Sequence, residues 1–154
     1  MKAAALGLVC AVALQASFAQ EVASCRDPKG PSYFHHAGGT AKAGAGWTTD
    51  KISGGRISLI QTRDQVDLLF TDIRLKPMSA TADGAKVILL RSTGEAATVL
   101  VMYSHSTEVY TFFSEKDGSA KFTMFQTKTG DLMPVPKSSL MLGDCEPMSL
   151  SLLK

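Results

Sequence analysis

The chain has 154 residues, of which 45% are hydrophobic and 19% charged, and a formal net charge of +2. This length suits one domain, and the composition excludes an intrinsically disordered or collagen-like chain. Positive and negative charges alternate without basic or acidic blocks, so neither nucleic acid nor an anionic membrane surface is expected as a partner.

Residues 1–19 have the three parts of a secretory signal peptide. Lys2 supplies the early positive charge, residues 3–14 form an apolar run, and residues 17–19 (Ser-Phe-Ala) place small residues around a larger one. The apolar run is shorter than the roughly 20 residues that cross a bilayer. We therefore expect cleavage after Ala19 and a mature protein in the periplasm or outside the cell, without membrane attachment. The chain contains no Asn and hence no N-glycosylation site, which favours a bacterial origin.

Cleavage would change the cysteine count from three to two. Cys10 is removed with the leader, and Cys25 and Cys145 remain. Two lone cysteines in an oxidising compartment normally pair, and neither has a second cysteine two residues away, as a metal or redox motif would require. We predict a Cys25–Cys145 disulfide rather than a reactive thiol or a metal ligand. A loop of about 120 residues would contribute roughly 4–5 kcal/mol of stabilisation.

Residues 20–53 have few apolar clusters. Many glycines and alanines, together with Pro28 and Pro31, predict an irregular N-terminal segment of the single domain, tethered by Cys25. Its three large aromatic residues are expected to anchor it to the core: Tyr33, Phe34 and Trp47.

Residues 54–154 have the pattern of successive strands. Apolar and polar residues alternate, or form short apolar runs, between turn residues, which predicts about seven strands. These strands are expected at residues 56–61, 65–73, 86–91, 98–103, 108–114, 121–127 and 139–145. Asp117-Gly118 predicts a hairpin turn of type I′, which needs positive φ at both central residues.

The whole pattern predicts an all-β protein. No convincing amphipathic helix is present in residues 20–154, and most connections are short. We expect an antiparallel up-and-down meander that closes as a small barrel or folds as a sandwich, and a monomer. The expected aromatic core residues are Phe70, Tyr110, Phe112, Phe113, Phe122 and Phe125.

Several short segments occur in an order and spacing typical of one protein family. They are Gly46-Trp47-Thr48, Ile52-Ser53-Gly54-Gly55, Leu69-Phe70-Thr71-Asp72, Glu108-Val109-Tyr110-Thr111-Phe112, Glu115-Lys116-Asp117-Gly118, Lys121-Phe122-Thr123 and Gly143-Asp144-Cys145. From Cys25 to Cys145 the chain resembles a family of small uncharacterised secreted proteins of proteobacteria. This resemblance implies a signal peptide, one domain and export, and it brings no known activity.

Known catalytic and cofactor signatures are missing from the sequence. There is no Gly-x-Ser-x-Gly motif, and the glycine-rich residues 38–46 lack the Gly-Lys-Ser/Thr ending of a phosphate-binding loop. Ser104, His105 and Ser106 place hydroxyls beside an imidazole, but adjacent residues of a strand or turn point in different directions. The sequence therefore predicts no enzyme and no cofactor.

Two groups of side chains are of types that form metal or acid–base sites. His35 and His36 are of the type that binds Zn²⁺ or Cu²⁺, and His105 could join them, but a closed site needs three or four ligands and adjacent histidines in an extended segment point apart. No metal is expected. Asp67 and Asp72 have opposite parity within one expected strand, so they should not form an acid–base pair.

The sequence favours a non-enzymatic binding or interaction module whose partner is an unknown protein or small molecule. The contact would lie in the barrel interior, or on a segment of four residues: Tyr33, His35, His36 and Trp47. A specific form of this hypothesis is an inhibitor of an exported enzyme. The alternative is a hydrolytic enzyme whose site assembles only in three dimensions. An open pocket with a histidine or carboxylate at its base would favour the enzyme, and a filled interior would favour interaction.

Overall fold

The computed structural model describes residues 19–71, 76–130 and 134–153. They form ten strands in one sheet and two short 3₁₀ helices. The strands are β1 Gln20–Phe34, β2 Gly46–Lys51, β3 Arg56–Gln61, β4 Val66–Thr71, β5 Met78–Ser79, β6 Lys86–Ser92, β7 Ala96–Met102, β8 Ser106–Ser114, β9 Ala120–Lys128 and β10 Lys137–Cys145, and the helices are η1 Lys42–Gly44 and η2 Leu150–Leu152. Residues 1–18 of the expected signal peptide lie outside the described ranges. Within those ranges, no helix has the length and apolar character needed to span a membrane.

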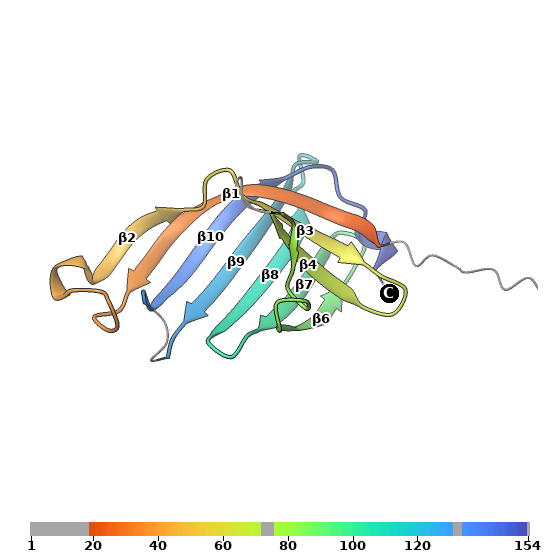
Figure 1. The fold of residues 1–154 in the computed structure, drawn as a ribbon. Coiled ribbons are helices and arrows are strands. Elements are labelled where there is room, and N and C mark those ends of the chain that lie inside the picture. Colours follow the sequence, from red (N-terminus) through yellow and green to blue (C-terminus); the bar gives the residue numbers. More distant parts are fainter. Residues whose placement is uncertain (1–18, 72–75, 131–133, 154) are drawn as a thin grey trace, which may run out of the picture.

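All pairings in the sheet are antiparallel, in the order β5-β4-β3-β1-β10-β9-β8-β7-β6, and β2 also pairs with β1. β1 therefore lies in the middle of the sheet, beside the last strand of the chain. The sheet curls so that β3 and β4 lie across from β7 and β8, which gives a half-barrel (Figure 1). The all-β antiparallel meander that the sequence predicts is confirmed, and it takes this half-barrel form.

The seven predicted strands correspond to β3, β4 and β6 to β10, and the first two turn apolar side chains to the inner face. Ile57 and Leu59 on β3 and Leu68 on β4 are at most 5% exposed. The count is nevertheless ten rather than seven, because β1, β2 and β5 were not predicted. β5 has only two residues, which is too short for any periodic pattern to show.

The prediction of an irregular segment over residues 20–53 is wrong, since this region contains the longest strand, β1, and also β2. Prolines are typical of irregular segments, but Pro28 lies within β1 at a bulge, where the register with β10 shifts between Arg26 and Lys29. Asp27 has a φ of 51° there, and its Oδ1 accepts a hydrogen bond from the Gly54 amide at 2.9 Å. A bulge accommodates a proline, which has no N–H to give to the ladder.

The predicted disulfide is present. Cys25 on β1 and Cys145 on β10 are bonded, and they are direct partners across the antiparallel pair with a Cα–Cα distance of 3.9 Å. The bond therefore joins the first and last strands where they already pair. Such a pair is consistent with an oxidising compartment.

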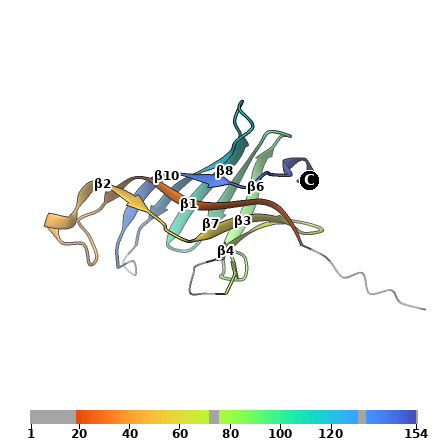
Figure 2. The same cartoon turned by 90° about the horizontal axis from the view of Figure 1, so that it is seen from above.

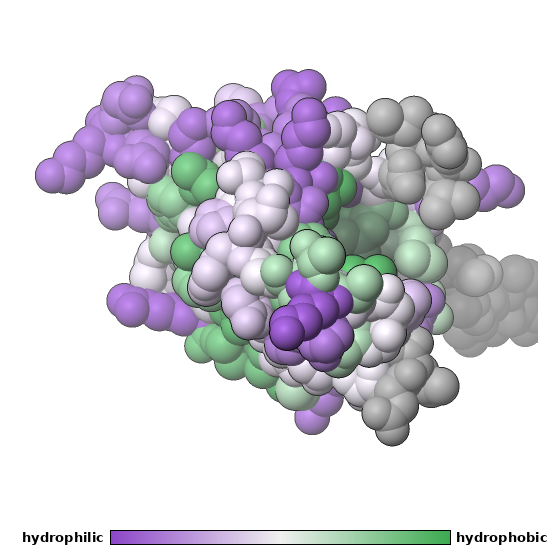
Figure 3. Space-filling model, turned by 90° about the vertical axis from the view of Figure 1, so that its left-hand side faces the viewer, coloured by the Kyte–Doolittle hydropathy of each residue, from purple (hydrophilic) through white to green (hydrophobic). Residues whose placement is uncertain are grey.

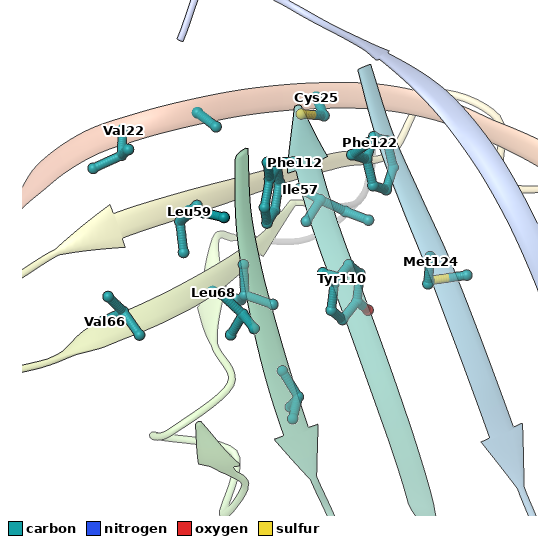
Figure 4. Packing of buried hydrophobic residues seen from close by; sticks show 14 of the residues in the cluster. Val22, Cys25, Ile57, Leu59, Val66, Leu68, Tyr110, Phe112, Phe122 and Met124 are labelled. Carbon is teal, nitrogen blue, oxygen red and sulfur yellow. The ribbon is translucent and has the colours of Figure 1, made fainter. Parts of the chain in front are cut away.

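The core lies inside the curl of the sheet (Figure 4). Phe112 packs between Tyr110 and Phe122, with ring centroids 6.5 and 6.0 Å apart, and all three side chains are at most 1% exposed. Two expected core residues are corrected: Phe113 is half-buried and Phe125 is 54% exposed. Each lies next to an inward-facing residue of its strand, so its own side chain points to the outer face.

The β8–β9 hairpin turns where Asp117-Gly118 predicts, but the predicted turn type is wrong. Only Gly118 has positive φ, at 85°, among the residues of this turn. The Gly118 amide donates to the Glu115 carbonyl at 3.0 Å, and the Glu115 amide donates to the Ser119 carbonyl at 2.8 Å. This is the three-residue loop in which a type I turn is followed by a left-handed glycine, rather than a two-residue type I′ turn.

Candidate functional site

A cavity of about 350 Å³ opens at one end of the half-barrel interior. The other end is filled by the aromatic stack around Phe112 (Figure 4). The inward-facing residues that line the cavity come from β3, β4, β8 and β9 and from the turn after β7, and include Ile57, Phe70, Tyr103, Glu108, Tyr110 and Met124. A cavity of this size and mixed lining is within the range of small-molecule sites.

Glu108 is the polar centre of the cavity wall and is 5% exposed. Its Oε2 accepts a hydrogen bond from the Tyr110 hydroxyl at 2.5 Å. Its Oε1 accepts from Gln126 Nε2 at 2.6 Å and from Ser106 Oγ at 3.2 Å. The cluster follows from strand geometry, because positions 106, 108 and 110 share one face of β8 and Gln126 is the cross-strand partner of Glu108 on β9.

All three partners of Glu108 are neutral donors. The ion pairs found within the described residues are Arg56–Glu146, Lys121–Asp144 and Lys137–Asp50, so no described cation pairs with Glu108. A carboxylate removed from water costs several kcal/mol when no countercharge is near, although hydrogen bonds offset part of this. Glu108 therefore gives the cavity a negative wall.

Both tyrosines of the cavity stay protonated well above neutral pH. Burial, together with the negative charges of Glu108, Asp83 and Asp67, raises the pKa of Tyr103 from 10.0 to about 12. Burial and the adjacent Glu108 also raise the pKa of Tyr110 well above its ordinary value. At physiological pH the cavity thus presents two phenol groups beside a carboxylate.

This arrangement predicts a loss of stability in alkali. Between pH 10 and 12 the unfolded chain loses tyrosine protons that the folded protein still binds, so the free energy of unfolding falls as pH rises. In the folded protein we expect an ultraviolet phenolate titration with a component whose midpoint lies at about pH 12. The Tyr103→Phe variant should lack that component. A titration in which Tyr103→Phe removes only absorbance that appears near pH 10 would contradict the assignment.

Exposed polar residues surround the cavity mouth. His105 stacks on Tyr103, with ring centroids 5.8 Å apart, and its Nδ1 lies 3.4 Å from Ser104 Oγ. Ser106, by contrast, is buried and points to Glu108. Ser104 and Ser106 are thus in different environments on either side of His105. Arg56 also lines the mouth, where its guanidinium pairs with Glu146 at 3.2 Å.

The four residues expected to make a contact lie around the strand pair β1–β2, at the opposite end of the molecule from the C-terminus (Figures 1 and 2). Three of them form a chain of ring contacts: Tyr33 lies 5.4 Å from Trp47 and 5.7 Å from His35 between ring centroids. His36 is exposed beside them. Trp47 is 73% exposed and Tyr33 41%, so the expectation that they anchor this region to the core is wrong.

The histidines do not come together as a metal site. His35 Nε2 lies 3.2 Å from Ser138 Oγ, whereas His105 is at the cavity mouth. Across the described residues, no group of three or more His, Cys, Asp or Glu side chains is placed to hold a metal ion.

The outer face of the sheet carries a second hollow, of about 440 Å³, beside Trp47. Its apolar lining comes from Pro31, Val109, Phe125 and Leu140. Figure 3 views the molecule from the β2 side and shows exposed hydrophobic residues, in green, at the left and the lower left of the molecule. This hollow contains no buried charged group, in contrast to the inner cavity.

The residues that define the inner cavity were not identified as a candidate site from the sequence. A parity argument could have found Glu108, because it lies two residues before Tyr110 and four before Phe112 on a strand whose inner face is apolar. Asp67 is also buried, but it serves its own loop: its carboxylate accepts from the Leu68 and Thr81 amides at 2.8 and 3.2 Å and from the Ser79 hydroxyl. Asp72 lies outside the described residues, so the predicted opposite orientation of the two carboxylates stays a prediction.

Comparisons of the chain with protein-family models, with curated proteins and with solved structures found no match.

Proposed function

We propose that the chain is an exported, non-enzymatic binding protein whose half-barrel cavity holds a small molecule with an apolar body. The observation that carries the proposal is an open cavity of about 350 Å³ with apolar and aromatic walls and one buried, hydrogen-bonded carboxylate. Apolar walls with a few convergent polar groups are typical of ligand sites.

The polar cluster supports a binding role because it is unfavourable for folding. Apolar side chains of similar volume at positions 106, 108 and 126 would avoid the desolvation of a buried charge. Among the described residues, Glu108 Oε2 accepts one hydrogen bond, from Tyr110, whereas a carboxylate oxygen can accept two. A donor group of a ligand in the cavity would supply the second hydrogen bond.

The alternative of a hydrolytic enzyme has one observation in its favour, namely a carboxylate at the wall of an open cavity with His105 at the mouth. A general base must be free to take a proton from its substrate. Glu108 instead accepts bonds from three donors, which fix it as an acceptor. Hydrolysis of a chromogenic ester or glycoside that is lost in Glu108→Gln would favour the enzyme over the binding protein.

Variants with a single tryptophan can show whether a ligand binds in the inner cavity or on the outer face. Trp47 is the only tryptophan of the chain and lies on the outer face. Phe70 is half-buried, lines the inner cavity and packs 6.2 Å from Tyr110 between ring centroids. The double variant Trp47→Phe/Phe70→Trp therefore moves the only indole to the cavity wall.

We expect at least one of 2-phenylethanol, 2-phenylethylamine and 3-phenylpropionate to change the indole fluorescence of the double variant in a saturable manner, and to leave that of the wild-type protein unchanged. No response of the double variant to any of the three compounds at millimolar concentration would overturn the proposal. A response confined to Trp47 would place the contact on the outer face instead. That outcome would favour a protein as the partner, for example an exported enzyme that this protein inhibits. An assay of a lytic enzyme in the presence of the purified protein would then test the inhibitor hypothesis.

A further inference from the structure

The charges around the inner cavity are separated by depth. Glu108 is 5% exposed in the wall, and no described cation pairs with it. The positively charged side chains of the lining, Arg56 and Lys128, belong to the first residue of β3 and the last residue of β9. Arg56 is already paired with Glu146. The interior is therefore negative, and the cations are at the mouth.

Two further carboxylates act on the same side chain, Tyr103, from outside the buried part of the cavity. Asp83 is exposed and lines the cavity mouth, whereas Asp67 is 5% exposed, lies outside the lining and has backbone amides and a hydroxyl as its partners. Both act with Glu108 on Tyr103, whose pKa they help to raise. The negative charges that act on Tyr103 thus come from three elements: β4, the connection between β5 and β6, and β8.

The walls around this charge are aromatic and apolar. Tyr103, Tyr110 and Phe70 line the cavity, with Met124 and Ile57 beside them. The faces of aromatic rings attract cations, and the attraction is strongest where water is excluded. A carboxylate beside aromatic faces is a combination that recognises an organic cation.

A metal ion does not fit the same space. Hard cations need six or more oxygen ligands and Zn²⁺ needs about four close ligands. Within the described residues no such group of side chains exists, and Ser106, Tyr110 and Gln126 use their protons to donate to Glu108. The volume of about 350 Å³ is that of a molecule with a ring, not of a bare ion.

We propose that the inner cavity selects an organic ammonium compound, whose charged nitrogen donates to Glu108 Oε2 and whose apolar body packs against Phe70 and Met124. This inference rests on the proposed binding function and adds the chemical class of the ligand. An anionic compound is disfavoured because its charge would lie beside a buried carboxylate that no described cation neutralises, and a neutral alcohol lacks the charge-assisted bond.

Calorimetric titration of the wild-type protein with three compounds of similar shape tests the inference directly. We expect 2-phenylethylamine to bind roughly 10- to 100-fold more tightly than 2-phenylethanol, the range for a hydrogen bond to a charged partner. We expect 3-phenylpropionate to bind more weakly than the alcohol. Equal affinity for the amine and the alcohol, or tighter binding of the acid, would overturn the selection for cations and leave the binding function standing. No binding of any of the three would overturn both.

Glu108→Gln keeps the size of the side chain and removes its charge. In this variant the preference for the amine over the alcohol should fall to about threefold or less, while the alcohol still binds. Glu115→Gln is the matched control, because it makes the same change on the exposed β8–β9 turn. A full preference for the amine in Glu108→Gln would overturn the role of Glu108. The comparison of compounds on the wild-type protein remains decisive if Glu108→Gln does not fold.

Discussion

Replacing Cys25 and Cys145 together with alanine is expected to lower the free energy of unfolding by roughly 4–5 kcal/mol. The disulfide joins residues 120 apart in sequence, so it removes a large loop-closure entropy from the unfolded chain. The two residues are direct partners of the β1–β10 ladder, so the native register does not depend on the bond. The variant should therefore keep the fold and lose stability.

Urea unfolding measures this difference, with wild-type protein compared before and after reduction. The reductant should destabilise the wild-type protein by about the same amount as the double substitution and should leave the double variant unchanged. A loss of less than about 1 kcal/mol would mean that the unfolded chain stays compact around the two cysteines, contrary to the entropic argument.

Phe112→Ala is expected to cost about 3–5 kcal/mol, the range for removing a large buried aromatic side chain. Phe112 is fully buried and packs on Tyr110 and Phe122 in the filled end of the half-barrel. The neighbouring elements are held by the sheet, so the space left behind cannot close completely.

Phe113→Ala is the matched control. It removes the same side chain from the next position of β8, which is half-buried and lies outside the core cluster. We expect a loss of about 1 kcal/mol or less, as for a substitution near the surface. Similar losses in both variants, measured by the same unfolding experiment, would show that the stack around Phe112 is not the centre of the core.

The two ends of the half-barrel interior differ in what they contribute. The end around Phe112 and Phe122 is apolar and filled, and it stabilises the fold. The end around Glu108 is hollow and contains a buried charge, which opposes folding. A local conflict with the rules of core packing is expected at functional sites, and this one lies at the wall of an open cavity.

The sequence by itself determined the seven strands β3, β4 and β6 to β10, the position of the β8–β9 turn and the disulfide. The strands follow from alternation of apolar and polar residues, which is a local property that each strand carries in its own residues. The disulfide prediction used only the count of cysteines left after the expected cleavage. Neither required any knowledge of how the strands are arranged.

Only the tertiary structure determined that β1 and β2 are strands and that the interior contains a cavity. β1 contains two prolines and lacks a clear alternation, and it becomes a strand because β10 and β3 supply its hydrogen-bonding partners on both sides. Parity places Glu108 on the inner face of its strand, but it becomes part of a cavity wall only because the sheet curls over that face. Pairing over long sequence distances and the curvature of a sheet depend on all the strands at once, and no local pattern contains them.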